Sequence, residues 1–129
     1  MKTVWINGCF DVLHRGHIEL FKYAKSLDSF VVVGIDSDSR VKQLKGSSRP
    51  INNQNDRKFF LESIRYIDKV VIFNSEDELR TVISMHSPDI MIVGSDYKDK
   101  KVIGSEYSKE LKFFNRIGNY STTNILEKK

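Results

Sequence analysis

Short runs of β-branched and aliphatic residues alternate with longer amphipathic stretches along the chain. The apolar runs are too short and too continuously apolar for surface helices, so they predict buried strands. These runs lie at Val4–Ile6, Phe30–Ile35, Val70–Phe73 and Ile90–Val93, and a fifth strand is expected at Leu111–Asn115. Strands that are apolar along their whole length indicate a sheet that is covered on both faces.

The stretches between these runs repeat apolar residues at helical spacing. They predict helices over Gly16–Leu27, Asn55–Ile67 and Glu76–His86, and a further helix over Thr122–Lys128. Strands and helices that alternate in this way form right-handed βαβ units with parallel strands. We therefore expect residues 1–129 to form a single-domain α/β fold, a Rossmann-like, doubly wound, five-stranded parallel sheet.

Composition narrows the class of protein. A length of 129 residues suits one domain, and the single cysteine excludes an intramolecular disulfide, which favours a reducing, cytoplasmic location. No apolar run approaches the roughly 20 residues of a membrane span, so we expect no membrane partner. The net charge of +4 suits an anionic small molecule. Because the basic residues are scattered among acidic ones, a nucleic-acid partner is not expected.

Two segments lack strong periodicity, Ser37–Asn53 and Gly94–Ser108. Each follows a predicted strand. Ligands of open α/β sheets bind outside the carboxyl ends of the strands. These segments are therefore the candidate substrate loops.

The most informative segment is the junction between the first strand and the first helix, Gly8–His17. A helix N-terminus favours anions, phosphate above all, and His14 and His17 add hydrogen-bond donors. A pair of structural turn histidines is the alternative. The clustering of Gly8, Phe10, Gly16 and both histidines at one junction favours phosphate binding.

Charged residues follow two other predicted strands. Asp36 is placed to orient a ribose or a metal, and Lys42, Lys45 and Arg49 offer cations for phosphate oxygens. A solvated surface loop is the alternative for these cations. Asp96, after the fourth strand, is placed to contact a base or a substrate hydroxyl, with a polar turn as its alternative.

Near the C-terminus, three consecutive hydroxyl residues, Ser121, Thr122 and Thr123, begin the last predicted helix. They offer side-chain and backbone donors to one anion, although simple N-capping needs only one of them. Together with the first histidine-bearing junction, this second site suits a polyphosphate that is gripped at both ends.

At these residues the chain resembles the cytidylyltransferase-like nucleotidyltransferases, from Ile6 through Ile125. His14-Arg-Gly-His17 looks like the HxGH signature of that family, and Tyr120-Ser-Thr-Thr123 looks like its second signature. The resemblance implies a five-stranded doubly wound sheet that is often dimeric. It also implies magnesium-dependent transfer of a nucleoside monophosphate from a nucleoside triphosphate to a phosphate-bearing acceptor, with release of pyrophosphate.

The resemblance implies catalytic roles for three residues. His14 and His17 stabilise the pentavalent α-phosphate, and Lys45 bridges the donor and acceptor phosphates. The hydroxyls of residues 121–123 hold the β- and γ-phosphates. The residues expected to bind the nucleotide are Gly8, Cys9, Phe10, Gly16, Asp36, Asp96, Arg116, Tyr120, Ser121, Thr122 and Thr123.

The acceptor is expected to contact Asp11, Lys42, Arg49 and Arg57. Magnesium is the expected cofactor, held mainly by the phosphates, with Asp11 as its candidate protein ligand. Cys9 lies inside the phosphate loop, but its small size and burial explain it better than nucleophilic catalysis.

The subfamily signals are mixed. Lys45–Ile51 and Ser95–Lys98 look like the adenylyltransferase domain of ADP-heptose synthases. Leu61–Asp68 and Arg116 are similar to glycerol-3-phosphate cytidylyltransferases. Gly118-Asn119 departs from both groups, which usually carry Glu-Gly before the second signature.

The function expected from the sequence is nucleotidyl transfer from CTP or ATP to a phosphorylated sugar or polyol, such as a heptose 1-phosphate, for surface-polysaccharide precursors. A glycerol-3-phosphate cytidylyltransferase that makes CDP-glycerol is the alternative within the family. A non-catalytic nucleotide-binding module is the alternative from another class. A homodimer is expected from the resemblance alone.

Overall fold

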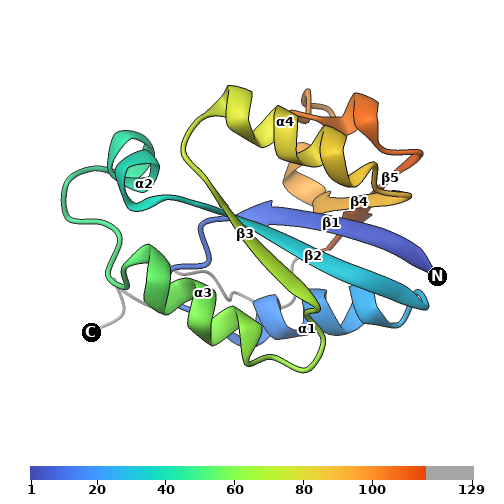
Figure 1. Cartoon of the computed structure of the whole chain (residues 1–129), viewed down its shortest axis with the longest axis horizontal. Helices are drawn as coiled ribbons and strands as arrows, with labels where there is room; N and C mark the ends of the chain where they lie inside the picture. The colour runs from blue at the N-terminus through green and yellow to red at the C-terminus, as the bar shows by residue number, and fades with distance from the viewer. Residues whose placement is uncertain (116–129) are drawn as a thin grey trace.

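A single parallel sheet organises the chain (Figure 1). The computed structural model describes residues 1–115. The strand order is β3-β2-β1-β4-β5, and every neighbouring pair runs parallel. The strands are β1 (Lys2–Gly8), β2 (Ser29–Asp36), β3 (Lys69–Phe73), β4 (Ile90–Gly94) and β5 (Glu110–Phe114). The expectation of a doubly wound, Rossmann-like five-stranded sheet is confirmed.

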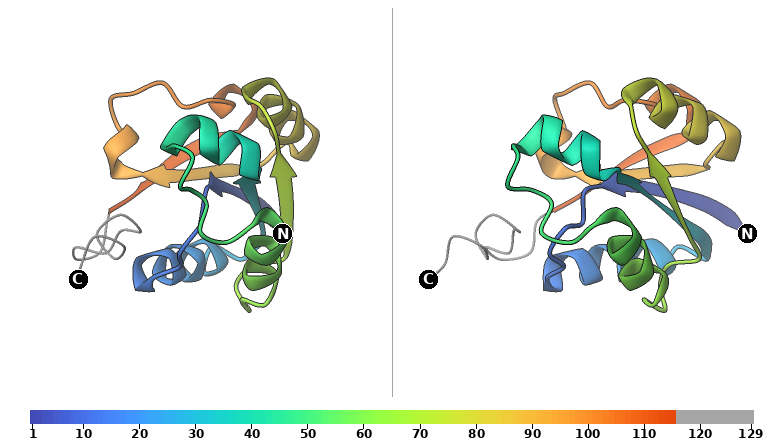
Figure 2. Two further views of the ribbon diagram at one scale, coloured as in Figure 1. Left: turned by 90° about the vertical axis from the view of Figure 1, so that its left-hand side faces the viewer. Right: turned by 60° about the vertical axis from the view of Figure 1, so that its left-hand side comes forward.

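Helices cover both faces of this sheet (Figures 1 and 2). On one face lie α1 (Arg15–Lys25) and α3 (Gln54–Glu62). On the other face lie α4 (Glu76–His86) and two short 3-10 turns, η1 (Ser95–Tyr97) and η2 (Ser105–Tyr107). A short helix, α2 (Asp38–Lys45), lies beyond the carboxyl ends of the strands. The chain reverses its direction of winding between β1 and β4, which is where such sheets bind ligands.

Alternate side chains of the strands form two separate hydrophobic layers. Ile6 and Val33 point to the α1 and α3 face, whereas Trp5 and Val32 point to the α4 face. All four are 2% exposed or less. Continuously apolar strands are therefore explained by burial on both faces.

The structure departs from the sequence prediction at two helices. Residues 38–45 form α2, where the sequence predicted only a loop. Ser37 caps this helix by accepting a hydrogen bond from Arg40 N, and Gly46, at φ 100°, ends it. Val41 is its one buried residue, so the helix carries almost no apolar period. The second predicted helix is shorter than expected: α3 ends at Glu62, and residues 63–66 continue as turns and a bend.

The predicted helix over Thr122–Lys128 lies outside the described residues. Within residues 1–115, no helix is long and apolar enough to cross a membrane.

Candidate active site

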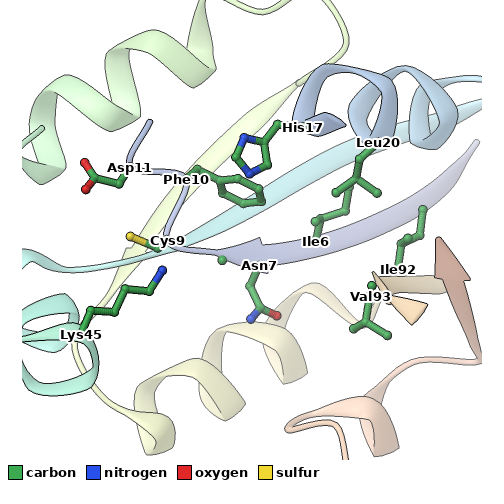
Figure 3. Close-up of a pocket in the computed structure, with 12 residues that line it drawn as sticks. Ile6, Asn7, Cys9, Phe10, Asp11, His17, Leu20, Lys45, Ile92 and Val93 are labelled. Carbon is green, nitrogen blue, oxygen red and sulfur yellow. The ribbon is translucent and has the colours of Figure 1, made fainter. Parts of the chain in front are cut away.

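Two adjoining pockets lie at the carboxyl ends of β1 and β4. The first, called here the His17 pocket, has a volume of about 210 Å³ (Figure 3). The second, called the Tyr97 pocket, has a volume of about 340 Å³ and also reaches Asp36 and Arg40. The residues that line both pockets are Asn7, Gly8, Cys9, Lys45, Val93 and Gly94. The pockets therefore meet at the end of β1, the position expected for a ligand of this topology.

The two histidines of the Gly8–His17 junction form a rigid pair at the start of α1. His14 is the N-cap residue, and its backbone N–H donates to His17 Nδ1 over 3.2 Å. The two rings stack with their centroids 3.7 Å apart, and the Phe10 ring packs edge-on against His17 at 5.2 Å. This spacing of N-cap and N3 is the capping-box spacing, here with imidazoles in place of hydroxyl and carboxylate. The orientation of the His17 ring is thereby fixed.

The protonation state of His17 follows from the same contacts. Burial, the neighbouring His14 and the Lys45 charge together lower its pKa from 6.5 to about 3. The imidazole is therefore neutral at physiological pH. Because Nδ1 accepts from His14 N, the single ring proton lies on Nε2. His17 thus offers its pocket a neutral N–H donor.

Lys45 brings a positive charge to the same place from a different element. It is the last residue of α2, and Figure 3 shows its ammonium group reaching toward Cys9. It lines both pockets and remains exposed. An anion in either pocket therefore meets this charge. The sequence prediction placed Lys45 on a loop, whereas the structure places it at a helix end.

Cys9 lies between the two pockets with its thiol half-buried. Burial raises the pKa of this thiol above its ordinary value, which outweighs the opposing charges of Lys45 and Arg57. The thiol is therefore protonated and a poor nucleophile at neutral pH.

Asp11, predicted as an acceptor contact or metal ligand, lines the His17 pocket, but both of its carboxylate oxygens accept hydrogen bonds from the chain itself. It is 2% exposed, and its Oδ2 accepts from Arg49 Nε (3.0 Å) and from Ile51 N (2.8 Å). Its Oδ1 accepts from Asn52 N (2.8 Å). Burial alone raises the pKa of this carboxyl, but these hydrogen bonds prevail and lower it. Asp11 thus anchors residues 49–52 beside the site.

The prediction that Arg57 binds the acceptor is wrong. Its side chain is fully buried, and its Nη1 donates to Cys9 O (3.0 Å) and Asp36 O (2.7 Å). Its Nε donates to Asn52 O, and its Nη2 pairs with Asp38. A guanidinium with these internal partners binds no substrate. It holds the end of β1, the end of β2 and the start of α2 together.

Arg49 differs from Arg57 in having a donor to spare. Its Nε pairs with Asp11, but its buried Nη2 has no hydrogen-bond partner within the part of the chain that the structure describes. Buried donors of this kind are rare in folded proteins and call for a partner, such as a water, an ion or a ligand. Arg49 itself lines neither of the two pockets.

The remaining predicted residues divide into three groups. Gly8, Phe10 and Asp36 line a pocket, and Asp36 also accepts from Arg40 Nε over 2.8 Å. Three others line neither pocket, namely Gly16, Lys42 and Asp96. The predictions for Arg116, Gly118-Asn119, Tyr120, Ser121, Thr122 and Thr123 lie outside the described residues.

Sequence reasoning missed four polar residues that line the pockets: Asn7, Arg40, Tyr97 and Lys101. One signal was available for Asn7, because it is the single polar side chain that follows the apolar run of β1 before the glycine. The other three were not singled out, although they lie in the two predicted substrate loops: Arg40 in Ser37–Asn53, and Tyr97 and Lys101 in Gly94–Ser108.

A family model described as cytidylyltransferase-like matches residues 5–128. The chain belongs to the cytidylyltransferase-like family. This match confirms the family resemblance expected from the sequence.

Relatives of this cytidylyltransferase-like chain include the bifunctional protein HldE of Campylobacter fetus, 45% identical over 97% of the chain, and that of Nitratiruptor, 45% identical over 98%. The chain spans 27% of the length of each of these relatives. A crystal structure of the lipopolysaccharide core biosynthesis protein from Thermoplasma volcanium superimposes with a TM-score of 0.71 at 27% identity. The superposition covers 92% of this chain and 99% of the Thermoplasma volcanium chain.

Proposed function

We propose that this chain transfers a nucleoside monophosphate from CTP or ATP to a phosphorylated sugar or polyol, such as a heptose 1-phosphate, and releases pyrophosphate. The observation that carries this proposal is the neutral Nε2–H donor of His17 and the Lys45 ammonium on one pocket. The similarity to a lipopolysaccharide core biosynthesis protein supports a product for surface polysaccharide.

The chemistry needs positioning and charge neutralisation rather than a protein nucleophile. An oxygen of the acceptor phosphate attacks the α-phosphorus and forms a new P–O bond. The bond from that phosphorus to the bridging oxygen breaks, and pyrophosphate leaves with the electron pair. His17 donates a hydrogen bond to the α-phosphate as its charge grows, with His14 fixing the ring. Lys45 neutralises charge on both reacting phosphates.

Arg49 is the residue we assign to the acceptor phosphate. Asp11 holds the guanidinium through Nε, which leaves the buried Nη2 to donate to an incoming anion. A pre-oriented guanidinium loses little entropy when it binds a phosphate oxygen. The acceptor anion thereby supplies the hydrogen bond that this donor lacks.

Magnesium is proposed to arrive with the triphosphate. Within residues 1–115 no group of three His, Cys, Asp or Glu side chains is placed to hold a metal ion. The Asp11 oxygens already accept internal hydrogen bonds. The described residues therefore do not build a metal cage, and Mg²⁺ commonly keeps its waters and binds substrate phosphates instead.

The test is a screen of CTP and ATP against heptose 1-phosphate and glycerol 3-phosphate with magnesium, with released pyrophosphate as the measurement. Lys45→Met should lower kcat at least 100-fold, because it removes the charge at the reacting phosphates. Lys22→Met, on the exposed side of α1, is the matched control and should act like the wild type. Absence of pyrophosphate with every pair would refute the proposal.

The same screen separates the alternatives. Turnover of CTP with glycerol 3-phosphate alone would identify the CDP-glycerol enzyme. Nucleotide binding measured by calorimetry without any turnover would identify a non-catalytic module. The intact histidine pair and Lys45 favour catalysis, because binding alone does not require this set.

We also propose a homodimer that uses α3. Phe59 is 66% exposed and Phe60 is 44% exposed on this helix. Adjacent exposed aromatic rings are typical of a protein contact. Light scattering should show a dimer that Phe59→Ser weakens, whereas Met85→Ser, 77% exposed on α4, should leave it intact. A monomer at all concentrations would exclude the dimer.

A further inference from the structure

Asn7 is the polar side chain that stands where the two pockets meet. It lies at the carboxyl end of β1 and lines both pockets together with Lys45. Figure 3 shows its carboxamide extending from the strand on the side opposite to His17. Asn7 is therefore one of the polar groups available to a ligand that extends from one pocket into the other.

The buried Trp5 fixes which end of the Asn7 carboxamide faces the pockets. Trp5 Nε1 donates to Asn7 Oδ1 over 2.9 Å. An indole N–H only donates, so its partner must be the carboxamide oxygen and not the nitrogen. The Nδ2 group then points away from Trp5. The hydrogen bond therefore converts a group that can flip into a fixed donor.

Trp5 itself has no freedom to turn. It is 0% exposed, and its ring lies 5.6 Å from the ring of His86 between centroids. The indole also packs directly against the backbone of Gly34, because a Cβ at that position would lie 2.5 Å from Cζ2 of the ring. The ring is held between β2 and α4, so the direction of its N–H is set by the core.

We propose that Asn7 donates its Nδ2–H to a phosphate oxygen of the bound ligand at the junction of the two pockets, and that Trp5 is the positioning residue for this contact. This inference rests on the proposed function, because it assumes a polyphosphate ligand. A phosphate fits better than a base or ribose because the Lys45 charge lines the same two pockets. Asn7 adds a neutral donor on the wall opposite His17.

The experiment measures the Kd of CTP, ATP and inorganic tripolyphosphate by calorimetry for the full chain and its variants. Asn7→Ala should raise the Kd of tripolyphosphate about tenfold, since it removes one hydrogen bond to a charged group. Asn7→Asp keeps the shape and should weaken it further, because a carboxylate repels phosphate. Asn55→Asp, on the exposed side of α3, is the matched control and should leave the Kd near the wild-type value.

A double-mutant cycle tests the role of Trp5. Trp5→Phe keeps an aromatic ring but removes the N–H, so it should weaken tripolyphosphate about threefold when Asn7 is present. In the Asn7→Ala background it should have no further effect, which a purely structural role of Trp5 does not predict.

Three results would overturn the inference: no binding of tripolyphosphate by the wild type, an unchanged Kd for a folded Asn7→Asp variant, or equal effects of Trp5→Phe in both backgrounds. Binding that follows the predicted pattern without any release of pyrophosphate would instead refute the proposed function alone.

Discussion

Replacing Gly34 by alanine tests whether the close approach of β2 to Trp5 is needed for the core. An added Cβ would lie 2.5 Å from Cζ2 and 2.8 Å from Cη2 of the indole. Carbon atoms pack comfortably at about 3.5–4.0 Å, so the ring must move by about 1 Å. The β2 backbone cannot retreat, because Gly34 pairs with Asn7 on one side and Val71 on the other. The strain therefore falls on Trp5.

Two opposing effects set the magnitude. Overpacking of a well-filled core costs about 1–3 kcal/mol. Replacing a strand glycine by alanine returns about 0.5–1 kcal/mol through the entropy of the unfolded chain. The expected net loss in the free energy of unfolding is about 1–2 kcal/mol. With 129 residues and about 2.1 cal/mol/K of unfolding entropy per residue, Tm should fall by about 4–7 °C.

The assay is urea unfolding followed by intrinsic tryptophan fluorescence. Trp5 is the single tryptophan, so its fluorescence follows the ring directly. Gly94→Ala is the matched control: nothing lies within 4 Å of its Cβ, and its φ of −64° suits alanine. Its free energy of unfolding should stay within about 0.5 kcal/mol of the wild type. A Gly34→Ala variant as stable as Gly94→Ala, with unchanged fluorescence, would refute the packing argument.

Three further predictions concern charged and titrating groups. The unfolded state binds a proton at His17 near its ordinary pKa of 6.5, but the folded state only near 3, so acid weakens the fold between these values. Between pH 7 and pH 4, the free energy of unfolding measured with urea should fall less for His17→Asn than for the wild type. Asp11→Asn should cost about 2–4 kcal/mol at pH 7, because Arg49 is left buried without its counter-charge. Because the fold lowers the Asp11 pKa, the difference in free energy of unfolding between the wild type and Asp11→Asn should be largest above about pH 4 and should shrink in acid. A difference that does not change with pH would contradict this prediction. Arg57→Met should lower the free energy of unfolding by about 3 kcal/mol or more, since it orphans the carbonyl groups of Cys9 and Asp36. An unchanged urea midpoint for Arg57→Met would argue against its structural role.

Most of the fold was predictable because its signals are local. Continuous apolar runs, such as those in β2 and β4, predict buried parallel strands whatever lies between them. The winding then follows from right-handed crossover connections. The helix α2 escaped prediction because only Val41 is buried on it, so its stability comes from the Ser37 cap and from contacts made elsewhere.

The site divides in the same way. The sequence by itself determined the His14 and His17 pair, because a capping spacing at a strand–helix junction is a local pattern. Only the tertiary structure decided that Arg57 is an internal brace and that Asn7 is a pocket residue. The role of Arg57 depends on hydrogen-bond partners up to 48 residues away in the sequence. The orientation of Asn7 depends on Trp5, which packs against Gly34 and His86. A residue type states what a side chain is able to bind, but burial and long-range partners decide whether that capacity faces the ligand or the core.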